Sequence, residues 1–118
     1  MDGDTSAMRT AAEIERDGRV LEIPSVTVLE PYIGVGIVAG SREEERSVRR
    51  VIDSIPVVRM DDGIARRAGR LIGRLRTDGI TLGKGDAVIG ATALVEEEPV
   101  LTRNVREFER IPGLVVER

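Results

Sequence analysis

The sequence has 118 residues and a nearly balanced charge, with 18 basic and 21 acidic side chains and a net charge of −3. Its length suits one domain of roughly 100–150 residues, and the 41% hydrophobic content excludes a wholly disordered chain. No apolar run approaches the ~20 residues that span a bilayer, and the N-terminus lacks the basic-then-apolar pattern of a signal peptide. We therefore expect a single soluble, cytoplasmic domain over residues 1–118 with no membrane association.

Two residue types are missing altogether, and their absence excludes several kinds of chemistry. The chain has no Cys and no His, which excludes a disulfide scaffold, a thiolate nucleophile, a Ser-His-Asp triad and a zinc site built on thiolate or imidazole. Any acid–base or metal chemistry must therefore use carboxylates. The balanced charge also argues against nucleic-acid binding through a large positive field, although it leaves room for local arginine stripes.

In the first third of the chain, the pattern predicts a helix over 7–16 and a short strand over 20–23. Ser25 is expected to cap a second helix. Pro31 lies inside that helix and should either kink it or confine its regular part to one side, because proline lacks a backbone donor. A glycine-rich stretch follows over 34–40.

The next helix has the best-defined start and end. Ser41, followed three residues later by Glu44, forms a capping box, and Pro56 should end the helix. A strand is expected over 57–60. The apolar stripe of this helix consists of Val48, Val51, Ile52 and Ile55.

Asp61 or Asp62 should cap a fourth helix that ends near Gly79. This helix has an apolar face and an arginine-rich face formed by Arg66, Arg67, Arg70, Arg74 and Arg76. The remaining expected elements are a buried helix over 86–96, a strand over 99–102, a helical turn over 105–110 and a strand over 114–116. Strands separated by helices predict a parallel sheet with helices on both faces, and functional residues beyond the carboxyl ends of its strands.

Two carboxylates lie in apolar surroundings. Glu30 falls within the apolar stretch 26–38, where a buried carboxylate needs a partner or a metal ion; a solvent-facing position is the structural alternative. Asp86 opens the nearly all-apolar stretch 86–91. Its structural alternative is a helix cap or a first-turn acid that complements the helix dipole.

A group of polar residues follows strand 99–102. In the structural interpretation, Thr102 or Asn104 caps the short helix, which Phe108 anchors. In the functional interpretation, Asn104 or Glu107 lies beside the other carboxylates at the edge of the sheet where the strands end. Such a cluster of hard oxygen ligands suits Mg²⁺ or Mn²⁺.

Two parts of the sequence resemble one known family. Residues 86–95 and 99–114, which include Thr-Arg-Asn-Val-Arg-Glu-Phe, are similar to the C-terminal signature of PIN-domain proteins, and most of all to that of VapC-type toxins of toxin–antitoxin systems. Residues 23–34, which contain Glu30, resemble the family's segment that ends in its second acidic residue. The resemblance covers residues 7–117 in the family's order.

The resemblance implies a three-layer α/β ribonuclease whose acidic cluster holds Mg²⁺ or Mn²⁺, which activates a water for attack on an RNA phosphodiester. It also implies a cognate antitoxin as a partner, and a homodimer. By the same resemblance, catalysis and metal binding are assigned to Glu30, Asp86 and Glu107, and contacts with the RNA substrate to Thr102, Arg103 and Asn104.

The N-terminus departs from the family pattern. PIN proteins begin with an apolar strand that ends in the first catalytic Asp, followed by Thr or Ser, whereas here almost nothing apolar precedes Asp4-Thr5-Ser6. We therefore expect a PIN-like domain that is incomplete at its N-terminus and lacks the first strand and first acid. The upstream reading frame is expected to encode an apolar run with an Asp-Thr or Asp-Ser pair.

Two functions of different classes follow. The first is a metal-dependent endoribonuclease of a type II toxin–antitoxin system. The alternative is a catalytically impaired PIN-fold module that binds an antitoxin or RNA without cleavage, which is favoured by the absent first acid, by Glu107 in place of the family's usual Asp, and by Pro31 directly after Glu30. A weaker third function is an α/β domain for a small phosphorylated ligand.

Overall fold

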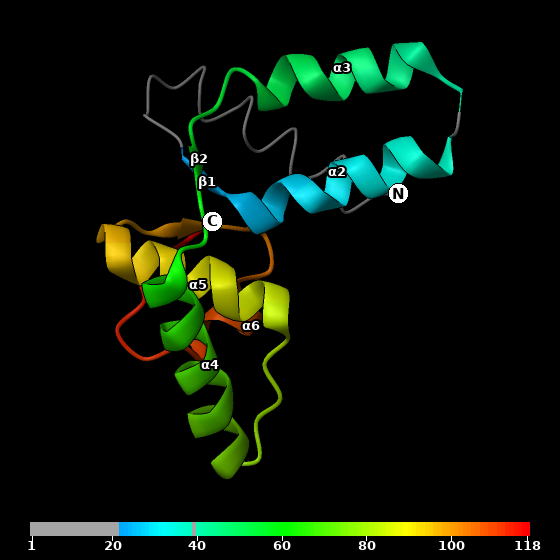
Figure 1. Ribbon diagram of the computed structural model, residues 1–118. Coiled ribbons are helices and arrows are strands. Elements are labelled where there is room, and N and C mark those ends of the chain that lie inside the picture. Colours follow the sequence, from blue (N-terminus) through cyan, green and yellow to red (C-terminus); the bar gives the residue numbers. More distant parts are fainter. Residues whose placement is uncertain (1–21, 39) are drawn as a thin grey trace. The chain divides into compact units, whose positions relative to one another are not determined.

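The structure is a computed structural model that describes residues 22–38 and 40–118. The chain divides into two compact units, Met1–Val58 and Arg59–Arg118, and each is described by itself. Figure 1 shows the elements in chain order. The predicted helix over 7–16, the first half of the predicted strand over 20–23, and the Asp4-Thr5-Ser6 triplet lie outside the described residues.

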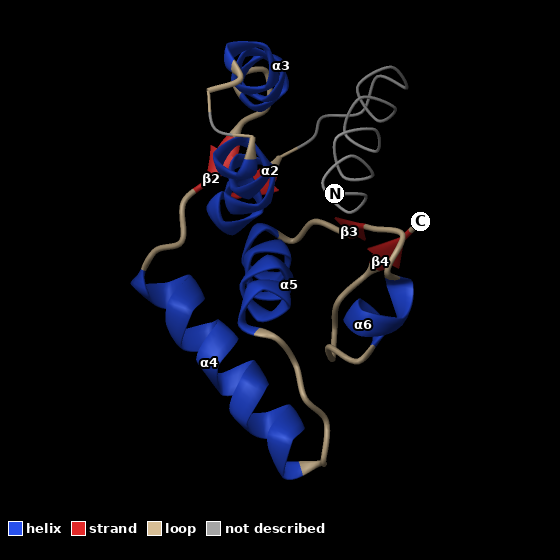
Figure 2. Cartoon of the chain, turned by 90° about the vertical axis from the view of Figure 1, so that its right-hand side faces the viewer, coloured by secondary structure: helices blue, strands red, loops and turns tan. Residues whose placement is uncertain are grey.

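The described part of the first unit combines one parallel strand pair with two helices. Strand β1 (Ile23–Pro24) pairs with β2 (Val57–Val58), and the amide of Ile23 donates to the carbonyl of Pro56 at 3.0 Å. Helices α2 (Ser25–Ile37) and α3 (Arg42–Ile52) lie side by side (Figures 1 and 2). The core between these elements consists of Ile23, Val48, Ile52 and Ile55, against which Val28, Tyr32, Val35 and Val51 pack.

Helix α2 differs from its prediction at both ends. Pro24 rather than Ser25 occupies the N-cap position, and the helix continues through the buried Pro31 to Ile37. It therefore includes part of the glycine-rich stretch that was expected to follow it. The physical reason is packing, because Tyr32 and Val35 contact the core of this unit only if the helix continues past the proline.

Helix α3 confirms its predicted start and its buried face. The hydroxyl of Ser41 accepts a hydrogen bond from the amide of Glu44 at 3.2 Å. The helix ends at Ile52, before the predicted stop at Pro56. Its apolar stripe lies in the core, so the pattern of apolar residues identified the buried side of the helix.

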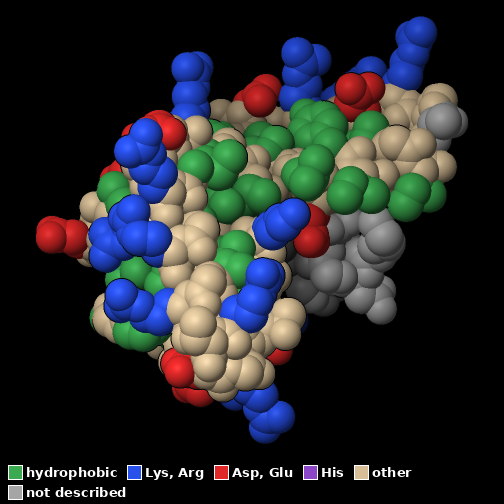
Figure 3. Space-filling model, turned by 60° about the horizontal axis from the view of Figure 1, so that its bottom comes forward, with side chains coloured by type: hydrophobic (Ala, Val, Ile, Leu, Met, Phe, Trp, Pro, Cys, Tyr) green, Lys and Arg blue, Asp and Glu red, His purple; other side chains and the backbone are tan. Residues whose placement is uncertain are grey.

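The second unit begins with two helices that pack on each other, α4 (Asp62–Thr77) and α5 (Lys84–Glu96). Asp61 caps α4, since its carboxylate accepts from the amide of Ile64 at 2.8 Å. The buried face of α4 includes Ala68 and Leu75, and its five arginines are exposed as predicted. Figure 3 shows Lys and Arg side chains spread over the visible face among exposed hydrophobic ones.

The chain continues through strand β3 (Val100–Leu101), helix α6 (Val105–Glu109) and strand β4 (Val116–Glu117). Strands β3 and β4 pair in parallel, with Val100 opposite Val116. Strand β4 begins later than predicted because Gly113 adopts a φ of 79° and extends the turn after α6. The core of this unit contains Ile64, Ala68, Leu75, Leu82, Ala87, Ala91, Val100, Phe108 and Ile111.

Parallel pairing and the alternation of strands with helices confirm the predicted α/β class. In both strand pairs of the described residues, each strand is only two residues long. Within the same residues, every helix is too short or too polar to cross a lipid bilayer.

Candidate functional site

Asp86 lies in the first turn of α5, two residues after the helix begins at Lys84. The helix starts earlier than predicted because Gly83 acts as its N-cap, and the carbonyl of Gly83 accepts from the amide of Ala87 at 2.9 Å. Asp86 is therefore an acidic residue in the first turn of the helix, as one of its two structural alternatives predicted, and it is not the helix cap that the other predicted. The side chain is half-buried at this position.

The electrostatic surroundings of Asp86 bring two further residues into the site. Burial raises the pKa of the Asp86 carboxyl above its usual value, and the negative charge of Glu107 raises it further, while the Arg110 guanidinium acts in the opposite direction. Asp86 and Glu107, predicted from sequence as site residues, are therefore close enough to interact. Their mutual repulsion is a reason for such a pair to take up a cation.

Arg110 holds Glu107 in place, and sequence reasoning missed it. The guanidinium forms an ion pair with the Glu107 carboxylate and also donates from Nε to the Glu107 carbonyl at 3.2 Å. A third contact runs from Arg110 Nη1 to the carbonyl of Thr81 at 3.1 Å. An acid in a helix followed three residues later by an arginine at the end of that helix is the signal that could have found the pair.

The connection from β3 to α6 positions the residues predicted to bind substrate. The hydroxyl of Thr102 accepts from the amide of Asn104 at 3.0 Å, which stabilises the turn. Asn104 occupies the N-cap position of α6, but its side chain makes no capping hydrogen bond. Phe108 is buried and anchors the helix as predicted. The exposed Asn104 amide and the exposed Arg103 side chain therefore face solvent at the end of a strand.

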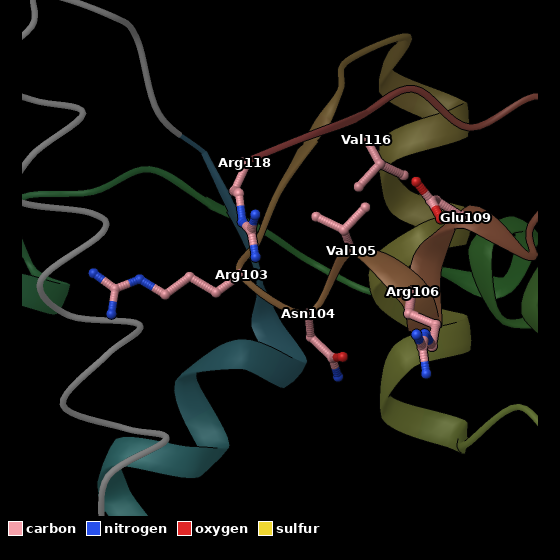
Figure 4. A pocket seen from close by; sticks show the side chains of 7 residues that line it. All are labelled: Arg103, Asn104, Val105, Arg106, Glu109, Val116 and Arg118. Carbon is pink, nitrogen blue, oxygen red and sulfur yellow. The ribbon is translucent and has the colours of Figure 1, made fainter.

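A pocket of about 480 Å³ opens beside this connection, entirely within the second unit. Figure 4 shows Arg103 and Arg106 on opposite sides of Asn104, and Val105 and Val116 side by side. The pocket is lined by Arg103, Asn104, Val105, Arg106, Glu109, Val116 and Arg118.

Glu30 lies on α2 in the first unit and is exposed, so its predicted solvent-facing alternative holds. Asp86 and Glu107, in contrast, belong to the second unit. Across residues 22–38 and 40–118, no three acidic side chains form a group able to hold a metal ion. Within the second unit, the structure brings together Asp86 and Glu107, which are two of the three predicted metal ligands.

The donor chemistry of that pair fits a hard divalent cation. Asp86 and Glu107 offer carboxylate oxygens, which Mg²⁺ and Mn²⁺ prefer, and Mg²⁺ is often bound through one or two carboxylates together with substrate phosphates and waters. Burial and the nearby charge of Glu107 disfavour the ionised form of Asp86 and raise the pKa of its carboxyl. A bound cation would offset both effects.

Comparison with known proteins agrees with these features. The PIN domain family matches residues 1–114. Ribonuclease VapC19 of Mycobacterium tuberculosis is 31% identical over 113 residues, which is 95% of this chain and 86% of that protein. The tRNA(fMet)-specific endonuclease VapC of Salmonella typhimurium is 30% identical over 95 residues, covering 80% of this chain and 72% of that protein.

Solved structures show the same fold. DNA-bound VapBC from Salmonella typhimurium matches with a TM-score of 0.75 and 30% identity, over 81% of this chain and 73% of that chain. VapBC2 from Rickettsia felis, bound to a DNA fragment from its promoter, matches with a TM-score of 0.74 and 25% identity, over 90% and 80% of the two chains.

The chain therefore belongs to the PIN-domain family. More narrowly, it is a VapC-type member, because both of these relatives are VapC proteins and VapBC complexes are among its structural neighbours. The resemblance drawn from residues 86–95 and 99–114 and the predicted α/β fold class are both confirmed.

Proposed function

We propose that this protein is a metal-dependent endoribonuclease toxin of a type II toxin–antitoxin system, acting as one PIN-like domain over residues 1–118. The observation that supports this proposal most is the interaction of Asp86 with Glu107 in the second unit. A half-buried carboxylate with a raised pKa beside a second carboxylate is typical of a functional site. The relatives named ribonucleases support the reaction class.

In the proposed site, Asp86 and Glu107 of the second unit would hold Mg²⁺ or Mn²⁺, and the family resemblance adds Glu30 as the third ligand. When bound, the ion would supply a nucleophilic water at neutral pH and would stabilise negative charge on the scissile phosphate. Arg110 orients the Glu107 carboxylate through its ion pair and keeps α6 close to the loop before α5. Thr102 shapes the turn that presents Asn104 and Arg103 to the RNA backbone.

We further propose a cognate antitoxin as a partner, a homodimer as the assembly and the cytoplasm as the compartment, with no attachment to membranes. The antitoxin proposal is supported by the solved neighbours, which are VapBC complexes. In such a system the antitoxin would cover the acidic site and block access of RNA.

The alternative is a PIN-fold module that binds RNA or an antitoxin without cleaving RNA. One specific observation favours it: the Glu107 carboxylate is already paired with Arg110. If the Arg110 guanidinium neutralises Glu107 enough to weaken its binding of a divalent cation, the site has too few effective carboxylates for catalysis.

An RNA cleavage assay separates the two functions. The purified chain is incubated with single-stranded and structured RNAs across a Mg²⁺ and Mn²⁺ series, with a chelated sample as the blank. Asp86→Asn, Glu30→Gln and Glu107→Gln should each lower the cleavage rate roughly 100-fold or more. Asp78→Asn is the matched control, because Asp78 is an exposed acid at the end of α4.

Cleavage that depends on the metal ion and on the three acids supports the enzyme. If folded protein leaves every RNA intact at all metal concentrations, the enzyme proposal is wrong. RNA or antitoxin binding by the same sample would then establish the binding module.

A further inference from the structure

The guanidinium group of Arg110 is held by three hydrogen bonds inside the second unit. Nη2 donates to Glu107 Oε2, Nε donates to the Glu107 carbonyl at 3.2 Å, and Nη1 donates to the Thr81 carbonyl at 3.1 Å. Two of these three acceptors are backbone carbonyls, so most of what holds the guanidinium does not depend on the Glu107 carboxylate. The positive charge therefore stays in place whatever that carboxylate binds.

Burial distinguishes Arg110 from other arginines that form ion pairs in the described part of the chain. The Arg110 side chain is 26% exposed, whereas those of Arg49 and Arg66 are 73% and 71% exposed in their pairs. A charge that is less exposed is also less screened by water and salt. The field of Arg110 therefore acts on neighbouring groups more strongly than that of a surface arginine does.

That field reaches both acids of the candidate site. Burial and the charge of Glu107 raise the pKa of the Asp86 carboxyl, and the charge of Arg110 opposes them. The fixed charges of the site are two carboxylates and one guanidinium, and −2 + 1 leaves a net charge of −1. A divalent ion that enters the site thus meets a resident positive charge as well as two negative ones.

We propose that Arg110 is a built-in counter-cation of the metal site, which competes with the divalent ion for the charge of Glu107 and so lowers the affinity of the site for that ion. This inference rests on the proposed metal site and concerns its regulation. Like charges repel more strongly where water is partly excluded, so a fixed guanidinium disfavours the bound ion. Without the ion, the same guanidinium offsets the repulsion between Asp86 and Glu107. Arg110 therefore raises the concentration of free ion that is needed to fill the site.

A role for Arg110 that consists of orientation alone leads to the opposite expectation. If the guanidinium only held the Glu107 carboxylate toward the ion, its removal would weaken ion binding. If it competes with the ion, its removal strengthens ion binding. Competition is favoured by the hydrogen bond from Nη2 to Glu107 Oε2, because that oxygen is one of the two that Glu107 offers to a cation. The sign of the change in metal affinity decides between the two roles.

Isothermal titration calorimetry with Mn²⁺, in the absence of RNA, measures this sign. Arg110→Gln removes the charge and supplies an amide donor in its place, and it should bind Mn²⁺ roughly tenfold more tightly than the wild-type chain does. Arg110→Lys keeps the charge and should bind the ion within about threefold of the wild-type affinity. The matched control is Arg106→Gln, which removes an exposed charge from the same helix. It should change the affinity less than about threefold, because an exposed charge is screened.

Two further measurements make the test independent of how well the variants fold. Circular dichroism at the temperature of the titration shows whether each variant is folded. In the wild-type chain, NMR measures how fast the Nε–H of Arg110 exchanges with solvent, with and without Mg²⁺. The exchange should be slow in both samples, because the acceptor of this hydrogen bond is the Glu107 carbonyl and not its carboxylate. Fast exchange that begins only when Mg²⁺ is bound would show that the arginine leaves the site, and would overturn the inference.

The outcomes separate this inference from the proposed function. If the wild-type chain binds Mn²⁺ and cleaves RNA, but Arg110→Gln binds the ion equally or more weakly, the inference is overturned and the enzyme stands. If Arg110→Gln binds the ion while the wild-type chain neither binds it nor cleaves RNA, the inference stands and the enzyme falls. If no folded chain binds the ion, both proposals are wrong. If Arg106→Gln binds the ion as tightly as Arg110→Gln does, the position of the charge has no effect and the inference is wrong.

Discussion

Arg110 and Thr81 lie 29 residues apart in the sequence and are joined by a hydrogen bond of 3.1 Å from the guanidinium to the backbone carbonyl. The same guanidinium pairs with the Glu107 carboxylate. One side chain thereby fixes helix α6 to the loop before α5, the helix that carries Asp86. The relative position of the two acids in the second unit depends on this arginine.

The first prediction concerns this contact. Arg110→Ala should lower the free energy of unfolding by about 1–2 kcal/mol, because two hydrogen bonds to carbonyls and one ion pair are lost. The side chains of Arg110 and Glu107 are 26% and 41% exposed, so the ion pair is partly screened. Urea unfolding followed by circular dichroism measures the loss.

Arg49→Ala is the matched control. Arg49 pairs with Asp53 at 3.7 Å, with both side chains at least 70% exposed, so its loss should cost at most about 0.5 kcal/mol. Equal losses of unfolding free energy in Arg110→Ala and Arg49→Ala would show that Arg110 contributes no more to stability than an exposed ion pair does.

The second prediction is a dependence of stability on pH. The folded chain holds the proton of Asp86 more tightly than the unfolded chain does, because burial raises the pKa of this carboxyl above its ordinary value of 3.8. Stability from this group is therefore fully present below pH 3.8 and is lost as the pH rises through the folded-state pKa. Asp86→Asn should then raise the Tm in chelator at pH 7, and the gain should vanish near pH 3.5.

Asp78→Asn serves as the control for loss of one negative charge. A gain in Tm for Asp86→Asn that is the same at every pH would contradict the pKa explanation.

The third prediction concerns divalent ions. Mg²⁺ or Mn²⁺ should raise the Tm of the wild-type chain, because an ion that binds only the folded state adds RT ln(1 + [L]/Kd), about 2.7 kcal/mol at a hundredfold excess over Kd. Chelation should reverse the shift, and Asp86→Asn should abolish it. Differential scanning calorimetry with the metal ion and with a chelator measures the Tm shift of the wild-type chain and of Asp86→Asn. A wild-type Tm that does not change when the ion is added would exclude the proposed metal site.

The fourth prediction concerns the packing of α5. A Cβ added at the buried Gly90 would lie 2.5 Å from Ile111 Cδ1. Gly90→Ala should therefore destabilise the fold by about 1 kcal/mol, since overpacking outweighs the gain in helix propensity. The substitution Ile111→Val removes that Cδ1 atom. In the Ile111→Val background, Gly90→Ala should therefore not lower the free energy of unfolding, and a double-mutant cycle measures this difference.

Gly73→Ala is the control in α4, where nothing lies within 4 Å of the added Cβ. It should stabilise the chain by about 0.5–1 kcal/mol. A stabilising Gly90→Ala would mean that Ile111 moves aside easily.

Helices whose ends carry local signals could be predicted from the sequence. Ser41 and Asp61 each accept a hydrogen bond from an amide three residues on, and the apolar stripes of α3 and α4 are buried. Capping and amphipathicity depend on residues within one or two turns, so they are visible in a short stretch of sequence. The parallel pairing of the strands followed from the alternation of elements.

Features that depend on tertiary packing could not be predicted in the same way. The passage of α2 through Pro31 rests on contacts with α3, and the bridge from Arg110 to Thr81 joins segments that are distant in sequence. For the site, Asp86 and Glu107 were predicted and lie together. The role of Glu30 stays a prediction, as do the substrate contacts of Arg103 and Asn104.

The short strands carry a consequence for how the chain folds. In each unit, two helices that follow one another along the chain pack together, α2 with α3 and α4 with α5. Helix pairs of this kind have low contact order and form quickly, whereas pairing Ile23 with Val57 closes a longer loop for few hydrogen bonds. Pairing of β1 with β2 should therefore be a late kinetic event that follows the docking of α2 on α3.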